Sequence, residues 1–106
     1  MLIDRRAHKR FIVNGQASFE LPSGKFQAEV VSISAGGLLL ITEAKPVMEE
    51  RLQVQFVLEG FAGQHQGEGR VTRLEPGVVG VEFVSKPEAL QEMLDWLESR
   101  FVAGLI

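Results

Sequence analysis

The sequence predicts an all-β domain, a six-stranded antiparallel β-barrel with a C-terminal α-helix. Apolar and polar residues alternate with a period of two through most of the chain, and turn-forming residues interrupt the alternation at short intervals. The period changes to that of a helix only near the end. Six short strands with no intervening helix favour an antiparallel barrel or a sandwich, and a closed barrel hides strand edges better in a chain this small.

Length and composition predict one domain spanning 1–106. We expect a flexible basic segment over 1–10, the barrel over 11–84 and the helix over 85–103. The 106 residues include no Cys, which excludes disulfides and thiolate metal sites. No apolar run approaches the roughly 20 residues that cross a membrane. These features predict a soluble cytoplasmic protein that does not contact a membrane.

The strands follow from the alternation of apolar residues and from the turns between them. Leu52, Val54, Phe56 and Leu58 recur at every second position, mostly with polar residues between them, as in a half-buried strand. The predicted strands are 11–21, 26–33, 38–42, 52–58, 69–74 and 78–84. The glycine-rich stretch 60–67 is predicted to be a loop, with His65 as a solvated loop residue.

The helix is predicted from a capping signal and a change of period. Ser85 and Glu88 have the spacing of a capping box, and Pro87 is tolerated in a first turn. The apolar residues that follow at helical spacing are Leu90, Leu94, Leu97 and Phe101. We expect this face to cover an open end of the barrel. The alternative is a dimer contact, so the chain is expected to be a monomer or a weak homodimer.

The residues show no pattern that is typical of an enzyme active site. His8 and His65 have no metal-ligand spacing and no partner at motif distance, and the carboxylates are scattered along strands and turns. We therefore expect no enzyme activity, no metal and no cofactor. The sequence is more typical of a binding module.

Basic residues gather at one end of an otherwise acidic chain. The candidates for binding there are Arg5, Arg6 and Arg10, of which the last two form an Arg-x-x-x-Arg pattern. Guanidinium groups grip phosphate in a bidentate manner and can bind guanine, whereas Lys offers a point charge. A short basic tail that is merely solvated is the alternative. The sequence pI near 5.4 argues against a nucleic acid polymer as partner, but a small anionic ligand remains open.

A second candidate element lies between two predicted strands. It contains small hydroxyl residues followed by glycines, namely Ser32, Ser34, Gly36 and Gly37. Such residues could simply make a tight turn. Glycines also let the backbone approach a ligand closely, and hydroxyl groups can hydrogen-bond it.

The order of these motifs, followed by the strand 77–83 and a helix, resembles the PilZ domain family. Its members are small β-barrels that bind cyclic di-GMP in bacteria, using Arg-x-x-x-Arg and Asp/Asn-x-Ser-x-x-Gly motifs. Arg6, Arg10, Ser34 and Gly37 match those motifs, whereas Ser32 stands where the family has Asp or Asn. The resemblance implies a cyclic di-GMP receptor in second-messenger signalling. Its candidate site comprises Arg5, Arg6, Arg10, Ser32, Ser34, Gly36 and Gly37.

Two rival functions remain beside the receptor. A degenerate adaptor on the same fold would bind proteins and no nucleotide, and Ser32 is the residue that favours it. A single-stranded nucleic-acid binder would need exposed aromatic residues among the basic ones, and Phe11 is the only aromatic residue near that cluster. A receptor of this kind is expected to act in trans on a downstream protein that the sequence does not identify. Arg5 would matter if two ligand molecules bind together.

Overall fold

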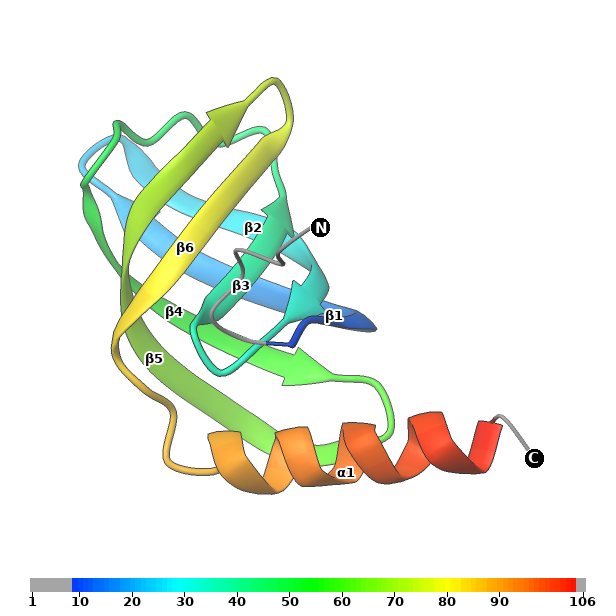
Figure 1. Ribbon diagram of the computed structural model, residues 1–106. Helices are drawn as coiled ribbons and strands as arrows, with labels where there is room; N and C mark the ends of the chain where they lie inside the picture. The colour runs from blue at the N-terminus through cyan, green and yellow to red at the C-terminus, as the bar shows by residue number, and fades with distance from the viewer. Residues whose placement is uncertain (1–8, 105–106) are drawn as a thin grey trace, which may run out of the picture.

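The computed structural model describes the backbone of residues 9–104 and the side chains of residues 9–100. In this part of the chain six strands form a closed barrel, and one helix follows them (Figure 1). The elements are β1 (Phe11–Leu21), β2 (Gly24–Ile33), β3 (Gly37–Ile41), β4 (Arg51–Leu58), β5 (Phe61–Glu75), β6 (Val78–Ser85) and α1 (Leu90–Gly104). The predicted six-stranded antiparallel barrel with a C-terminal helix is thus confirmed. Most of the predicted segment 1–10 lies outside the described residues.

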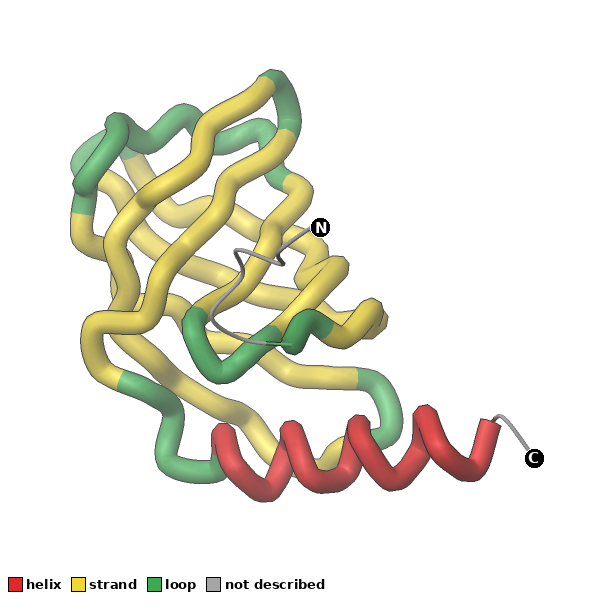
Figure 2. The backbone as a smooth tube through the Cα atoms, viewed as in Figure 1, coloured by secondary structure: helices red, strands yellow, loops and turns green. Residues whose placement is uncertain are grey.

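The barrel consists of two three-stranded meanders joined along both edges. Its strand order is β1-β2-β3-β6-β5-β4, and β1 pairs with β4 to close the ring. All pairs are antiparallel, and the tube view shows the short turns that connect the strands within each meander (Figure 2). Each of the six described strands pairs with two neighbours, so closure reduces the exposure of backbone hydrogen-bonding groups at the strand edges.

The core follows the predicted alternation. In β4 the residues Leu52, Val54, Phe56 and Leu58 are buried, and the polar residues between them are exposed. Successive side chains of a strand point to opposite faces, so one face of each strand fills the barrel interior. Burying a large apolar side chain contributes about 1.5–3 kcal/mol, which makes this interior the main source of stability.

The prediction of a loop over 60–67 was wrong. β5 begins at Phe61 and pairs with β4 through this stretch, with His65 opposite Phe56. The glycines and polar residues of this stretch have little preference for strand structure. The stretch forms a strand because it pairs with the regular strand β4. His65 is half-buried, and its ring lies 5.8 Å from that of Phe56 and 5.6 Å from that of Phe61. Its Nε2 atom is buried and has no hydrogen-bond partner in the described part of the chain.

The helix begins later than predicted, because Ser85 is the last residue of β6 and does not cap a helix. Pro87 is buried beside Gly67, and α1 starts at Leu90, whose N–H donates to the carbonyl of Pro87 at 3.1 Å. The apolar face of α1 packs within the chain, as expected, and lies across one end of the barrel (Figure 1). The buried residues of this face are Leu90, Met93 and Leu97, and Trp96 contacts Phe61 at a ring distance of 5.3 Å.

Within residues 9–104, no helix has the length and apolar character needed to cross a membrane.

Candidate functional site

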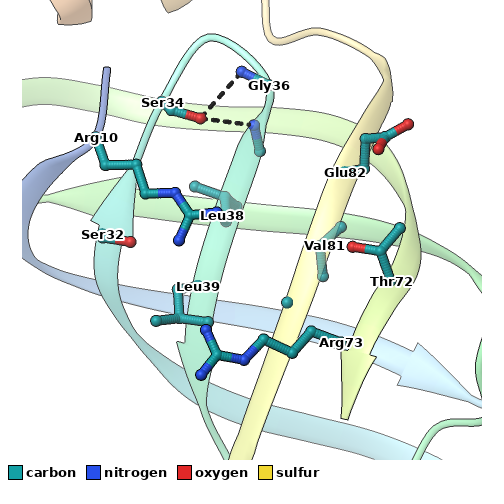
Figure 3. A pocket seen from close by; sticks show the side chains of 12 residues that line it. Arg10, Ser32, Ser34, Gly36, Leu38, Leu39, Thr72, Arg73, Val81 and Glu82 are labelled. Carbon is teal, nitrogen blue, oxygen red and sulfur yellow. Dashed lines mark hydrogen bonds between the residues drawn. The ribbon is translucent and has the colours of Figure 1, made fainter. Parts of the chain in front are cut away.

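A pocket of about 440 Å³ lies on the outer face of the barrel, over β2, β3, β6 and part of β5 (Figure 3). Its lining residues are Arg10, Ser32, Ser34, Gly36, Gly37, Leu38, Leu39, Thr72, Arg73, Gly80, Val81 and Glu82. Five of the seven predicted site residues are among them, and they come from both sequence motifs. The other two, Arg5 and Arg6, lie outside the described residues. Whether these residues bind a ligand stays a prediction.

The rim of the pocket is the turn between β2 and β3, and Ser34 holds it together. The Ser34 hydroxyl oxygen accepts hydrogen bonds from the N–H groups of Gly36 at 3.1 Å and Gly37 at 3.2 Å (Figure 3). The Ser34 N–H donates to the carbonyl of Gly37 at 3.0 Å. Ser34 is only 8% exposed. Its oxygen is therefore engaged by the turn itself, so its first role is to fix the backbone of the rim.

The same turn is fastened to β6. The N–H of Phe83 donates to the carbonyl of Gly36 at 2.7 Å, and Gly37 pairs with Glu82. A Cβ atom at Gly37 would lie 1.9 Å from the carbonyl oxygen of Val81, which no side chain can tolerate. Glycine at this position is thus required by the close approach of two strands.

Ser32 reaches the pocket through a β-bulge. Val30 pairs with Leu40 and Ser32 pairs with Leu39, so Val31 is the extra residue in β2. The extra residue shifts the alternation and places Ser32 on the outer face opposite Leu39. Ser32 is 7% exposed, and its hydroxyl makes no hydrogen bond with any side chain or backbone group that the structure describes.

Arg10 is an exposed cation of the pocket. It lies just before β1, and its guanidinium extends over the pocket between Ser34 and Ser32 (Figure 3). No carboxylate of residues 9–100 forms a salt bridge with it. The neighbouring Lys9 instead pairs with Glu98 of α1 at 3.0 Å, which ties the start of β1 to the helix.

Sequence reasoning missed the part of the pocket that β5 provides. Val71 pairs with Val81 and Arg73 pairs with Gly80, so Thr72 is the extra residue of a second bulge. The bulge brings Arg73 to the outer face, where its side chain lies beside Gly80. The available signal was Gly80 itself, because a glycine inside a strand often marks a close approach.

The charged residues that line the pocket are two arginines and one glutamate. Among the described lining residues Glu82 is the only carboxylate, and it accepts a hydrogen bond from Arg70 at 3.2 Å. Glu49 also binds Arg70, at 2.5 Å, and the hydrogen bonds to Glu82 and Glu49 raise the pKa of the Arg70 guanidinium. Arg73 forms an ion pair with Glu75, which lies outside the pocket lining.

This arrangement suits recognition of a planar anionic molecule. Arg10 and Arg73 present donor forks, and Leu39 contributes an apolar surface to the same lining. Among the described His, Asp and Glu residues, no three lie close enough to hold a metal ion.

Comparison with known proteins identifies one family and several solved structures with a similar fold. The PilZ domain model matches residues 4–99. The structure of the Bacillus subtilis inhibitor of motility MotI (DgrA) is 21% identical with a TM-score of 0.74, and the alignment covers 97% of this chain and 53% of MotI. The PilZ domain of Escherichia coli YcgR with c-di-GMP is 16% identical with a TM-score of 0.72, over 97% of this chain and 100% of that domain.

Escherichia coli YcgR in complex with c-di-GMP is 15% identical with a TM-score of 0.79, over 97% of this chain and 50% of YcgR. The chain thus spans about half the length of MotI and of this YcgR structure. At these identities the solved structures show a shared fold. No curated protein sequence matches the chain significantly.

Proposed function

The chain belongs to the PilZ domain family, and we propose that it is a non-catalytic receptor that binds cyclic di-GMP in the pocket beside Arg10. One observation carries the proposal. Arg10, the last residue of one motif, lines the same pocket as the second motif, which spans 32–37 and is distant in the sequence. A conserved fold alone would not require the exposed arginine and the glycine turn to face each other.

The chemistry of the pocket fits the chemistry of this ligand. Cyclic di-GMP carries two phosphates and two guanines, so a receptor needs cationic forks for phosphate or for the O6 and N7 atoms of guanine. Arg10 supplies one fork, and the motif predicts that Arg6 supplies another, with Arg5 as an additional candidate. Gly36 places no side chain at the rim of the pocket, and Ser32 offers a hydroxyl group that no described residue hydrogen-bonds.

Ser34 has an indirect role in the proposal. Its hydroxyl oxygen already accepts two hydrogen bonds from the turn. Ser34 therefore acts as a positioning residue that fixes the shape of the turn at the rim of the pocket, and its hydroxyl hydrogen remains available as a donor.

A protein-binding adaptor that lacks nucleotide binding is the second candidate, and a specific observation supports it. Ser32 replaces the Asp or Asn of the family motif, and the carboxylate of Glu82 is already paired with Arg70. The pocket thus has fewer unengaged acceptors for the N–H groups of guanine. In either function the chain would act on a downstream protein in trans, in the bacterial cytoplasm, without a cofactor.

One calorimetric titration with cyclic di-GMP distinguishes the two functions. The receptor predicts saturable heat for the wild type, and little or none for GTP at the same concentrations. Lys25→Ala is a matched control, because Lys25 is an exposed cation of β2 that does not line the pocket. The variant should bind as the wild type does. Absence of heat at high micromolar cyclic di-GMP from the folded wild type would exclude the receptor and leave the adaptor as the candidate function.

A further inference from the structure

We propose that Arg73 is a further ligand-binding residue of this pocket, and that its ion pair with Glu75 opposes binding until the ligand displaces it. The inference rests on the proposed function, because it concerns the affinity of the same pocket for cyclic di-GMP. It adds a cation from β5 that neither sequence motif contains, together with an acidic residue that competes for it.

The backbone is arranged so that Arg73 faces the pocket. The bulge at Thr72 reverses the alternation of β5 and sets Arg73 directly opposite Gly80 of β6. A Cβ atom at Gly80 would lie 2.8 Å from the Cβ of Arg73 and 3.7 Å from its Cγ and Cδ. Arg73 therefore crosses β6 through the space that the missing side chain of Gly80 leaves.

The guanidinium of Arg73 lies among the residues that line the pocket. Figure 3 shows it beside Leu39 of β3, while Arg10 reaches toward the same strand from the opposite side. Leu39 and Arg73 are both partners of Gly80 in the sheet, one on each side of β6. The two guanidinium groups thus flank one apolar surface, an arrangement that suits a flat ligand with anionic groups at separate positions.

In the structure, Glu75 forms an ion pair with the guanidinium of Arg73. The Nε atom of Arg73 donates to the carboxylate of Glu75, two residues further along β5, and both side chains are about half exposed, at 50% and 51%. An exposed ion pair of this kind shifts an equilibrium by at most about fivefold. Phosphate or the guanine edge can therefore displace Glu75, at a modest loss of affinity.

Removing the competing charge tests the inference by a gain of binding. Glu75→Gln should tighten cyclic di-GMP binding by about two- to fivefold in calorimetry. Glu68→Gln is the matched control, because Glu68 is also on β5 and pairs with an arginine, Arg51, outside the pocket. The control removes the same charge from the protein, so it measures the general effect of lowering the negative charge.

Removing the cation completes the test. Arg73→Ala should weaken binding by about 10- to 100-fold, as expected for loss of charge-assisted hydrogen bonds. The control Arg51→Ala should bind as the wild type does. In the double variant Arg73→Ala/Glu75→Gln the benefit of Glu75→Gln should disappear, because the carboxylate acts only through Arg73. Equal melting temperatures establish that all variants are folded.

The outcomes separate this inference from the proposed function. If the wild type binds and Arg10→Ala abolishes binding, but Arg73→Ala matches Arg51→Ala, Arg73 is not a ligand-binding residue and only the inference fails. If Glu75→Gln raises the affinity for cyclic di-GMP no more than Glu68→Gln does, Glu75 does not compete with the ligand. This outcome would refute the competition even if Arg73 binds the ligand. If neither the wild type nor Glu75→Gln binds cyclic di-GMP, the proposed function and the inference both fail.

Discussion

Ser34 and Gly37 are hydrogen-bonded to each other in both directions. The N–H of Ser34 donates to the carbonyl of Gly37 at 3.0 Å, and the N–H of Gly37 donates to the Ser34 hydroxyl oxygen at 3.2 Å. This reciprocal pair closes the turn that forms the rim of the pocket. It gives a structural reason for the Ser-x-x-Gly spacing, because only residues three apart in such a turn can exchange these bonds.

Ser34→Ala should therefore lower both stability and binding. The substitution leaves the N–H groups of Gly36 and Gly37 without their acceptor in a partly buried turn, which costs about 1–2 kcal/mol. The melting temperature should fall by about 5 °C. Ser85→Ala, at an exposed serine that ends β6, should melt as the wild type does. A Ser34→Ala variant with wild-type melting would show that the hydroxyl does not hold the turn.

Gly37→Ala should be more damaging than any other substitution in the turn. The added Cβ would lie 1.9 Å from the carbonyl oxygen of Val81, and this oxygen belongs to backbone that cannot move without breaking the β3–β6 ladder. We expect a loss of about 3 kcal/mol or more in the free energy of unfolding. Chemical denaturation of the variant and the wild type measures this loss in the free energy of unfolding. A loss below that for Ser34→Ala would contradict the close approach of the two strands.

Loss of either motif arginine should abolish most binding and leave the fold intact. Arg10 is exposed and pairs with no carboxylate of residues 9–100, so Arg10→Ala removes a ligand contact without removing a structural one. Removing one partner of a desolvated charge pair costs about 2–5 kcal/mol, or roughly 30-fold to several thousand-fold in affinity. Arg6→Ala is expected to behave in the same way. Calorimetry and thermal melting together test both variants, and wild-type affinity in both would exclude these arginines from the site.

The sequence predicted the regular parts of the fold because their local and tertiary preferences agree. In β4 an apolar residue recurs at every second position from Leu52 to Leu58, and each buried position of the strand follows from that pattern. In contrast, the first half of β5 contains Gly63 and Gly67, so its strand depends on pairing with β4 and not on local preference. Ser85 and Glu88 satisfied a local capping pattern, but Ser85 continues β6 instead.

The candidate site was predictable where a motif defines it and not where two distant strands build it. Arg10 and the turn 32–37 belong to such motifs. Arg73 faces the pocket only because Thr72 forms a bulge and because Gly80 lies opposite on another strand. Neither the bulge nor the register of β5 against β6 can be derived from one sequence, since each depends on how the whole barrel closes.

His65 should tolerate, and benefit from, replacement by an apolar residue. Its ring contacts those of Phe56 and Phe61, and its buried Nε2 has no hydrogen-bond partner among the described residues. A polar atom buried without a partner costs free energy, so His65→Leu should stabilise the fold by about 1 kcal/mol. Gln64→Leu is the control, at the exposed neighbouring position. A rise in melting temperature for Gln64→Leu that equals that for His65→Leu would show that added apolar surface alone explains the effect.

Ser32→Asp restores the residue type that the family motif has at this position, and it should tighten binding. Ser32 lies on the outer face opposite Leu39, and its hydroxyl is unengaged in the described part of the chain. A carboxylate there would accept charge-assisted hydrogen bonds from the N–H groups of guanine through two oxygens, whereas a hydroxyl offers one neutral acceptor with a shorter reach. The difference is about 1–2 kcal/mol, so the affinity for cyclic di-GMP should rise by roughly 5- to 30-fold.

The control for this prediction is Ser32→Asn, which has the shape of Asp without its charge. Calorimetry on the two variants separates the effect of the longer side chain from the effect of its charge. The gain in affinity should be larger for Asp, because charged hydrogen bonds are the stronger ones. The new carboxylate would also attract Arg10 in the free protein. This ion pair competes with the ligand, so it reduces the gain in affinity. A gain for Asn but none for Asp would mean that Arg10 captures the carboxylate. If neither variant nor the wild type gives heat at high micromolar ligand, Ser32 marks a chain that has lost nucleotide binding, and the adaptor function replaces the receptor.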